Sequence, residues 1–256
     1  MIRVAVAGCG GRMGTQVCGA VEGADDMTLV AGIDPSTSES MSVTRVDSVD
    51  ELTADDVDVV VDFTHITASR EVLSWCADNG VHAVSGVTGW SQDDLDAYRS
   101  AFTSSNALIV PNFAIGAVMM MRMAELAAPH FDTAEVIEFH HNAKRDAPSG
   151  TAMMTARRID AARNAAGPDF DDDPTEQEVV PGARGGKVGR VGVHGVRMHG
   201  MVAHQEVIFG TAGETLTIRH DSIDRSSFMP GVLLAVRSVS NRPGLTLGLD
   251  ALLFAT

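Results

Sequence analysis

The chain has 256 residues, enough for one large domain or two modest ones, and its 45% hydrophobic and 21% charged residues are ordinary for a globular protein. The formal net charge of −15 argues against a nucleic-acid partner, because phosphate binding requires a basic face. No apolar run approaches the roughly 20 residues that span a bilayer, and the first residues lack the layout of a signal peptide. We therefore expect a cytoplasmic protein with no membrane partner.

The first third of the chain alternates short apolar runs with helical patterns. Strands are expected at 2–7, 27–33, 57–63, 81–85 and 107–110, and helices at 12–21, 68–79 and 92–102. Strands that are apolar on both faces pair in parallel beneath covering helices. The pattern therefore predicts an α/β domain with a Rossmann-like, doubly wound parallel sheet, interrupted at 36–56 by a polar loop with a short strand.

The pattern changes after Pro111. Helices are expected at 114–128 and 149–166, and strands at 135–140, 191–198, 202–209 and 214–219. The last three strands are consecutive and are expected to be antiparallel, which predicts an α+β domain with a mixed open sheet. A final helix at 226–241 is expected to return to the first domain. We therefore expect one domain of residues 1–111 and 226–256, and a second of residues 112–225.

A glycine-rich turn follows the first strand. Gly8, Gly11 and Gly14 have the spacing G-x-x-G-x-x-G between a strand and a helix, which lets a backbone turn and a helix N-terminus approach the pyrophosphate of a dinucleotide. The second strand ends at Asp34, where an acid can hydrogen-bond the adenine ribose. Asp34 favours NADH, whereas Arg12 can meet the 2′-phosphate of NADPH, so we expect dual use of the two cofactors.

A second motif lies in residues 138–152, which read EFHHNAKRDAPSGTA. Two histidines end a strand, and Lys144 follows His140 by four residues in the next loop. Residues 149–151 then open a helix, whose first N–H groups, together with the Thr151 hydroxyl, can hold a carboxylate. Lys144 supplies a full positive charge and His140 can donate a proton near neutral pH. This arrangement predicts a site for a small anionic substrate.

Two other functions fit the same motifs. One is another NAD(P)-dependent dehydrogenase of a small anionic substrate, and the other is a non-catalytic NAD(P)H sensor. No metal site is expected, because the three cysteines show no ligand spacing and the histidines of the C-terminal strands fall on alternating faces. Those residues are Cys9, Cys18, Cys76, His194, His199 and His204.

Residues 4–14 (VAVAGCGGRMG) and 140–152 (HHNAKRDAPSGTA) resemble the signatures of the 4-hydroxy-tetrahydrodipicolinate reductase family, also called dihydrodipicolinate reductases, and most closely its short actinobacterial-type members. The resemblance extends over nearly the whole chain. It implies reduction of 4-hydroxy-tetrahydrodipicolinate, a small dicarboxylate, with NADH or NADPH in the diaminopimelate route of lysine biosynthesis. It also implies a homotetramer built through the second-domain sheets.

The resemblance implies roles for individual residues. His140 would be the proton donor, with Lys144 as its partner and a substrate contact, and His141, Gly150 and Thr151 would hold the substrate carboxylates. The cofactor would be bound by Gly8, Gly11, Arg12, Met13, Gly14, Asp34, Phe63, Gly86, Thr88, Pro111, Asn112, Phe113, Arg225 and Phe228. Two positions depart from the family pattern: Ala143 replaces a frequent basic residue, and Val87 lies in a turn usually written G-T-T-G.

Overall fold

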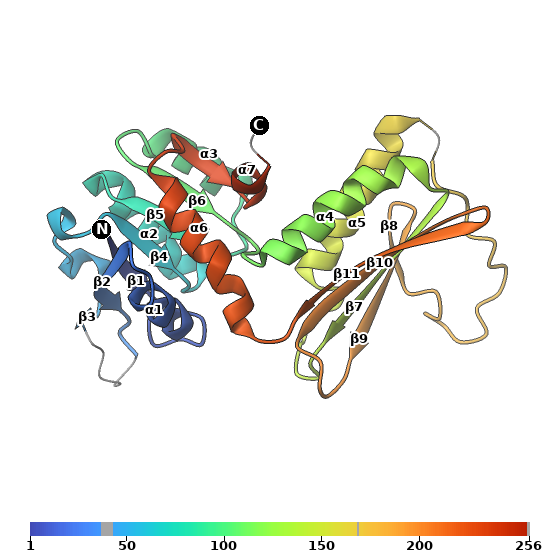
Figure 1. The fold of residues 1–256 in the computed structure, drawn as a ribbon, viewed down its shortest axis with the longest axis horizontal. Coiled ribbons are helices and arrows are strands. Elements are labelled where there is room, and N and C mark those ends of the chain that lie inside the picture. Colours follow the sequence, from blue (N-terminus) through green and yellow to red (C-terminus); the bar gives the residue numbers. More distant parts are fainter. Residues whose placement is uncertain (37–42, 168, 255–256) are drawn as a thin grey trace. The chain divides into compact units, whose positions relative to one another are not determined.

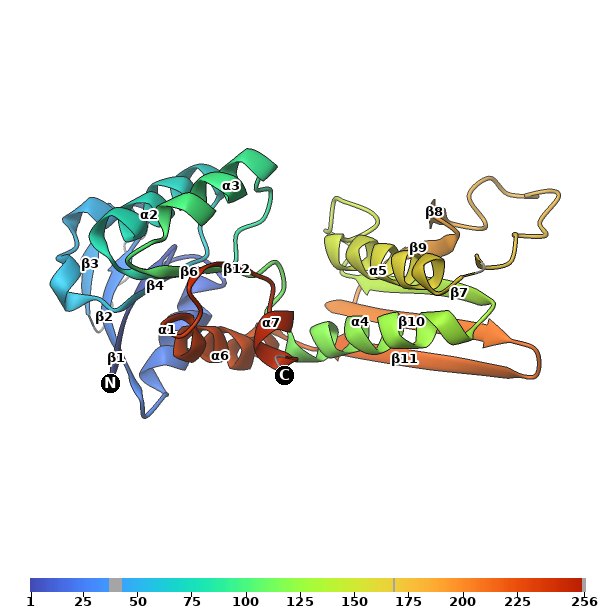
Figure 2. The same ribbon diagram turned by 90° about the horizontal axis from the view of Figure 1, so that it is seen from above.

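The computed structural model describes residues 1–36, 43–167 and 169–254. The chain forms two compact units, one of Met1–Ile115 with Arg225–Thr256 and one of Gly116–Asp224. Figures 1 and 2 show each unit as a sheet with helices packed on it. Part of the polar loop expected at 36–56, residues 37–42, lies outside the described residues. The short strand expected in that loop is present.

The first unit is built on a seven-stranded sheet in which every neighbouring pair is parallel. The strand order is β12-β6-β5-β4-β1-β2-β3, which reverses direction between β1 and β4. The strands are β1 (Ile2–Ala7), β2 (Met27–Ile33), β3 (Thr44–Val46), β4 (Val59–Asp62), β5 (His82–Ser85), β6 (Asn106–Ile109) and β12 (Gly244–Leu247). Loops after β1 and β4 therefore meet at a topological switch point, where parallel sheets bind ligands.

Helices cover both faces of this sheet, with α2 and α3 on one side and α1 and α6 on the other (Figure 2). The helices are α1 (Gly14–Glu22), α2 (Ile66–Asn79), α3 (Gln92–Ala101), α6 (Met229–Val239) and α7 (Asp250–Leu253), with 3₁₀ turns at Val49–Glu51, Ala54–Asp56 and Arg225–Phe228. The helix expected at 226–241 is thus a 3₁₀ turn followed by α6, which begins beside Pro230. Strand β12 was not predicted from the sequence.

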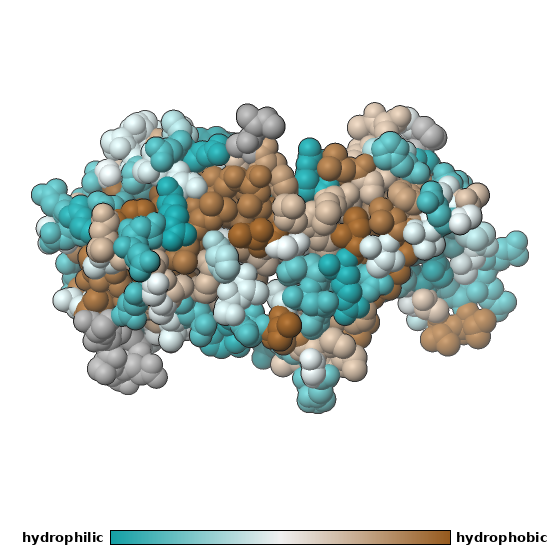
Figure 3. Space-filling view, in the orientation of Figure 1, coloured by the Kyte–Doolittle hydropathy of each residue, from teal (hydrophilic) through white to brown (hydrophobic). Residues whose placement is uncertain are grey.

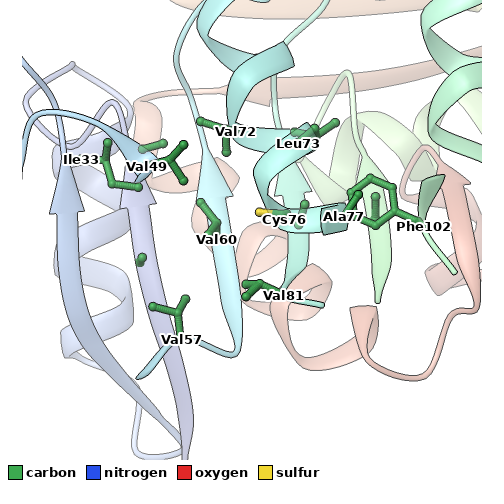
Figure 4. Packing of buried hydrophobic residues seen from close by; sticks show 14 of the residues in the cluster. Ile33, Val49, Val57, Val60, Val72, Leu73, Cys76, Ala77, Val81 and Phe102 are labelled. Atoms are coloured by element: carbon green, nitrogen blue, oxygen red, sulfur yellow. The ribbon is translucent and has the colours of Figure 1, made fainter. Parts of the chain in front are cut away.

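One hydrophobic cluster of the first unit lies between the sheet and α2. Val72, Leu73 and Cys76 of α2 pack over Val60 of β4, and all of these side chains are buried (Figure 4). Helix α2 ends where Gly80 adopts a left-handed conformation, with φ of 70°, and donates its N–H to the carbonyl of Cys76. Burial on both sheet faces explains the nearly continuous apolar character of these strands.

The second unit holds a five-stranded mixed sheet of order β11-β10-β7-β9-β8. Its strands are β7 (Thr133–His140), β8 (Gly186–Val188), β9 (Val191–Arg197), β10 (Ala203–Thr211) and β11 (Glu214–Ser222). Helices α4 (Ile115–Ala127) and α5 (Gly150–Ala166) flank a 3₁₀ turn (Ala128–His130) and β7 in the chain. Both helices pack on one face of the sheet, because the buried Gln205 amide contacts Thr155 of α5 and Met120 of α4.

Strands β9, β10 and β11 alternate in direction, as the sequence predicts, but they are not three neighbours in the sheet. β10 and β11 are antiparallel neighbours, but β7 lies between β10 and β9. β9 pairs with β7 in parallel, and α5 packs on both strands as the connection between them. A helical crossover returns the chain in the same direction, which allows this pairing. Alternating apolar residues identify a strand but not its partner.

No helix in residues 1–36, 43–167 or 169–254 has both the length and the apolar character that crossing a membrane requires.

Candidate active site

The glycine-rich loop packs so tightly that side chains have no room at two of its glycines. Gly8 has φ of 77°, and a β-carbon there would lie 2.9 Å from the carbonyl oxygen of Phe63. A β-carbon at Gly14 would lie 1.9 Å from the carbonyl oxygen of Gly8. The loop folds back on itself through a 2.9 Å hydrogen bond from Gly11 N–H to Gly8. The glycines therefore leave the backbone before α1 free of side chains at these two positions, as close approach to a phosphate group requires.

Asp34 lies buried at the end of β2 and is bonded to this loop. Its Oδ2 accepts a 3.1 Å hydrogen bond from Gly10 N–H, and its Oδ1 accepts hydrogen bonds from the N–H and hydroxyl of Ser36. Burial tends to raise the pKa of this carboxyl, but the bonds from Ser36 and Gly10 and the nearby Arg45 hold the pKa below its usual value. Asp34 is therefore an anion at neutral pH, while Arg12 is exposed in the same loop.

Aromatic rings lie beside the loops after β4, β5 and β6. The rings of Phe63 and Phe113 have centroids 5.4 Å apart, and a β-carbon at Gly86 would lie 2.3 Å from the Phe63 ring. Asp62 anchors this region, because its buried carboxylate accepts hydrogen bonds from the hydroxyls of Ser69 and Ser85 and from Thr64. Sequence reasoning gave Asp62 no role of its own.

The other residues expected to bind the cofactor lie in two places. Met13 precedes α1, while Thr88, Pro111 and Asn112 follow β5 and β6 at the same edge of the sheet. Arg225 and Phe228 lie on the 3₁₀ turn before α6, and no hydrogen bond or ion pair among the described residues joins them to the glycine-rich loop. The structure thus gathers most of the expected set at the carboxyl edge of the sheet. These residues fit a dinucleotide, because the bare loop suits a pyrophosphate and the Asp34 anion suits a ribose hydroxyl.

In the second unit, β7 carries the expected catalytic histidine at its last residue. Ala134, Val136 and Glu138 alternate along the strand as buried residues, so His140 lies on the same face. The Nδ1 atom of His140 lies 2.5 Å from Oε2 of Glu138, whose side chain is fully buried. This bond fixes the Nδ1–H form of the imidazole and leaves Nε2 as the nitrogen that can face a substrate.

Arg197, at the end of β9, completes the cluster. Its guanidinium donates to both oxygens of Glu138, at 2.7 and 2.8 Å, and to the carbonyl of Asp146 at 2.7 Å. The backbone N–H of Ser149 also donates to Glu138, at 3.1 Å. Glu138 therefore receives charged and neutral donors from β7, β9 and the start of α5.

The loop between β7 and α5 holds the remaining expected residues. The Lys144 ammonium contacts both oxygens of Asp146, at 2.8 and 2.9 Å, and the Lys144 N–H bonds to the carbonyl of His141. The hydroxyl of Ser149 caps α5 by accepting from Ala152 N–H. Gly150 is exposed, and a β-carbon there would meet no described atom within 4 Å. Open space therefore lies beside Gly150 at the helix start. Thr151 follows Gly150 directly, and the exposed His141 is the first residue of the loop.

Electrostatics favour a neutral His140 and a charged Glu138. Burial lowers the pKa of His140, the bond to Glu138 opposes that effect, and the charges of Lys144 and Arg197 lower the pKa further. Burial tends to raise the pKa of Glu138, but the bonds from Arg197 and His140 bring it below its usual value. The carboxylate therefore stays ionised while the imidazole remains able to gain and lose a proton.

Sequence reasoning assigned no role to Glu138 or Arg197. Glu138 could have been identified, because a residue two positions before His140 on a strand shares its face. Arg197 could not, because it is 59 residues from Glu138 in the chain and stands beside His140 only through the parallel pairing of β7 with β9.

The fold and these residues define a two-domain oxidoreductase of the nicotinamide-dependent class, with a parallel sheet whose glycine-rich loop suits a dinucleotide and a separate unit in which His140 pairs with a buried glutamate. Residues 2–113 match the family described as dihydrodipicolinate reductase, N-terminus, and residues 116–253 match dihydrodipicolinate reductase, C-terminus. The chain belongs to the dihydrodipicolinate reductase family.

Individual relatives agree with this assignment. The 4-hydroxy-tetrahydrodipicolinate reductase of Mycolicibacterium vanbaalenii is 50% identical, covering 98% of this chain and 99% of that protein. A protein of the same name from Nocardia farcinica is 52% identical and covers 98% of each chain. A solved structure of dipicolinate-bound dihydrodipicolinate reductase from Paenisporosarcina sp. TG-14 is 36% identical, with a TM-score of 0.87 and 98% of each chain covered.

The family, the fold class and the enzyme class expected from the sequence are therefore confirmed. Family membership favours the reductase over the two alternatives, a different dehydrogenase and a nucleotide sensor. The roles of individual residues and the choice between NADH and NADPH stay predictions.

Proposed function

We propose that this protein reduces 4-hydroxy-tetrahydrodipicolinate to tetrahydrodipicolinate with NADH or NADPH, as the reductase of the diaminopimelate route to lysine. The observation that carries this proposal is the His140–Glu138 pair beside the Lys144 loop and the start of α5, in a chain of this family. A dicarboxylate substrate suits a site with the Lys144 ammonium and one helix N-terminus.

The residues of the first unit account for cofactor binding. The glycine-rich loop would hold the pyrophosphate, and Asp34 would accept hydrogen bonds from the ribose of NADH. Exposed Arg12, in the same loop, would pair with the 2′-phosphate of NADPH, so that both cofactors are used. Gly86, Thr88 and the turn at 111–113 would face the nicotinamide, with Phe63, Arg225 and Phe228 nearby. The bound cofactor supplies a hydride to the unsaturated ring left when the substrate loses water.

The residues of the second unit account for substrate binding and proton delivery. Lys144, His141 and the first N–H groups of α5 at Gly150 and Thr151 would hold the two carboxylates. After hydride addition the enamine-like ring carbon takes a proton from Nε2 of protonated His140, and the neutral imidazole that remains keeps its Nδ1–H bond to Glu138.

We also propose a cytoplasmic homotetramer built through the sheets of the second unit. Met119, Met123 and Leu126 are exposed along α4, where Figure 3 shows apolar surface. Half-buried Ile137 and Phe139 lie on the sheet face opposite the helices. Such apolar surface favours contact with further copies of the chain. Light scattering of the purified protein in solution would give the number of subunits.

The reaction is tested by following oxidation of NADH and of NADPH by absorbance, with the unstable substrate made in the cuvette by the synthase that precedes this step. Substrate-dependent oxidation of both cofactors is expected, and the ratio of their kcat/KM values gives the preference. Cofactor binding without turnover would contradict the proposed reaction, and turnover with one cofactor alone would contradict dual use.

A further inference from the structure

We propose that Glu138 is a positioning residue for His140, and that the buried pair it forms with Arg197 fixes both the imidazole and the loop that carries Lys144. The proposal deepens the proposed function and rests on it, because it concerns how the proton donor is held.

Four donors converge on Glu138. They are Nδ1 of His140, both terminal nitrogens of Arg197 and the N–H of Ser149, at 2.5 to 3.1 Å. Two of the donors are charged, and charge-assisted bonds of this kind are roughly twice as strong as neutral ones. A carboxylate bonded on both oxygens from three segments of the chain cannot rotate without breaking several of these bonds. The direction of the His140 ring is therefore set by Glu138.

The same pair also holds the part of the Lys144 loop that leads into α5. Arg197 donates to the carbonyl of Asp146, whose carboxylate pairs with Lys144, and Glu138 accepts from Ser149, the residue that caps α5. Gly195 on β9 gives the pair its space, because a β-carbon there would lie 3.1 Å from Glu138 and 3.7 Å from Arg197. Movement of Glu138 would therefore disturb His140 and the Lys144 loop together.

The charges around His140 give Glu138 a second role. Three charged groups act on His140: Glu138 on its own strand, Arg197 on β9 and Lys144 in the loop, where Lys144 is itself paired with Asp146. Burial and the two cations oppose protonation of the imidazole, whereas Glu138 is the group in direct contact that favours it. Removing its negative charge would make the protonated donor scarcer at a given pH, besides releasing the ring.

The experiment compares Glu138→Gln with Glu135→Gln in the full-length protein. Glu135 is a matched control on the same strand, because its carboxylate also contacts a histidine and an arginine, His194 and Arg184. The first readout is an NMR titration of the His140 imidazole without substrate, which gives its pKa and tautomer. The second is the pH profile of kcat/KM.

Glu138→Gln is expected to lower the pKa of His140 by about one unit or more, the range for loss of an adjacent opposite charge. It should also move the alkaline limb of the kcat/KM profile to lower pH and lose the fixed Nδ1–H tautomer. Glu135→Gln should change none of these. If Glu138→Gln does not fold, Glu138→Asp is measured instead; its shorter carboxylate should also lower the pKa of His140.

The two proposals fail in different ways. An unchanged pKa and tautomer of His140 in the variant, with the wild type active on the expected substrate, would overturn the positioning role alone. If Glu138→Gln shifts the pKa of His140 but the wild-type protein does not reduce the substrate, the positioning of the imidazole is supported and the proposed reaction is overturned.

Discussion

Two clusters on β7 contain the same three types of residue on opposite faces of one sheet. In the first cluster, Glu138 contacts His140 at 2.5 Å and Arg197 at 2.7 Å. In the second, Glu135 contacts His194 at 2.7 Å and Arg184 at 2.6 Å. The two glutamates are three residues apart, and an odd spacing on a strand places side chains on opposite faces. Chemistry and distance alone do not separate the two clusters.

Burial separates them. The Glu138 side chain is fully buried and that of Glu135 is 30% exposed, while Arg197 is 19% and Arg184 is 41% exposed. In water an exposed ion pair contributes roughly 0 to 1 kcal/mol, because solvent can replace either partner. A buried carboxylate has no such replacement and depends on its own donors. The same three types of residue therefore form a buried, fully bonded cluster on one face of the sheet and a solvent-exposed ion pair on the other.

The largest expected effect comes from the histidines themselves. His140→Gln should lower kcat by about 10²- to 10⁴-fold, the usual contribution of a general acid, because glutamine cannot donate a proton in the same way. His194→Gln should leave kcat unchanged. Steady-state turnover of both variants, with cofactor affinity measured to confirm an intact first unit, checks the pair. Equal turnover in His140→Gln and the wild type would remove His140 from the proposed mechanism.

The sequence predicted the surroundings of this cluster better than its centre. The HH-x-x-K motif and the Ser149 cap are local, so periodicity and capping rules placed His140, Lys144 and α5 correctly within a residue or two. Likewise the glycine spacing and Asp34 are contained in one strand–turn–helix–strand segment. Arg197 depends on which strand pairs with β7, and the short strands β8 and β12 depend on edge pairing. Neither is encoded in local periodicity.

The second expected effect is on stability and concerns the arginines. Arg197→Met should destabilise the protein by about 3 kcal/mol, the lower end for breaking a buried ion pair, because Arg197 keeps some contact with water and Glu138 keeps two other donors. Arg184→Met should cost less than about 1 kcal/mol, as expected for an exposed pair. Urea denaturation of each variant gives these differences. Equal costs would show that burial does not distinguish the clusters.

The pH dependence of the Arg197 effect has a definite sign. The pKa of Glu138 lies below its unfolded value of 4.5, so the stabilisation of its charged form is present above pH 4.5 and is lost as the pH falls through the folded pKa. The gap in stability between wild type and Arg197→Met should therefore be largest near neutral pH and should shrink in acid. A gap that widens in acid would contradict an ionised Glu138.

The smallest expected effect comes from two glycines, and it separates distance from restraint. A β-carbon at Gly192 would lie 1.9 Å from Glu135, whereas one at Gly195 would lie 3.1 Å from Glu138. Distance alone predicts that Gly192→Ala is the more harmful change. The half-buried Glu135 can swing into water, however, while Glu138 is held by four donors and must carry His140 with it.

We therefore expect Gly195→Ala to lower kcat by about three- to tenfold, since a shift of a few tenths of an ångström in a catalytic group costs less than the hundredfold of a full ångström. Gly192→Ala should leave kcat unchanged, despite the closer contact. Parallel kcat measurements on the two alanine variants decide the order. If Gly192→Ala proves the slower enzyme, contact distance rather than the restraint on the carboxylate governs the site, and the two clusters differ less than their burial indicates.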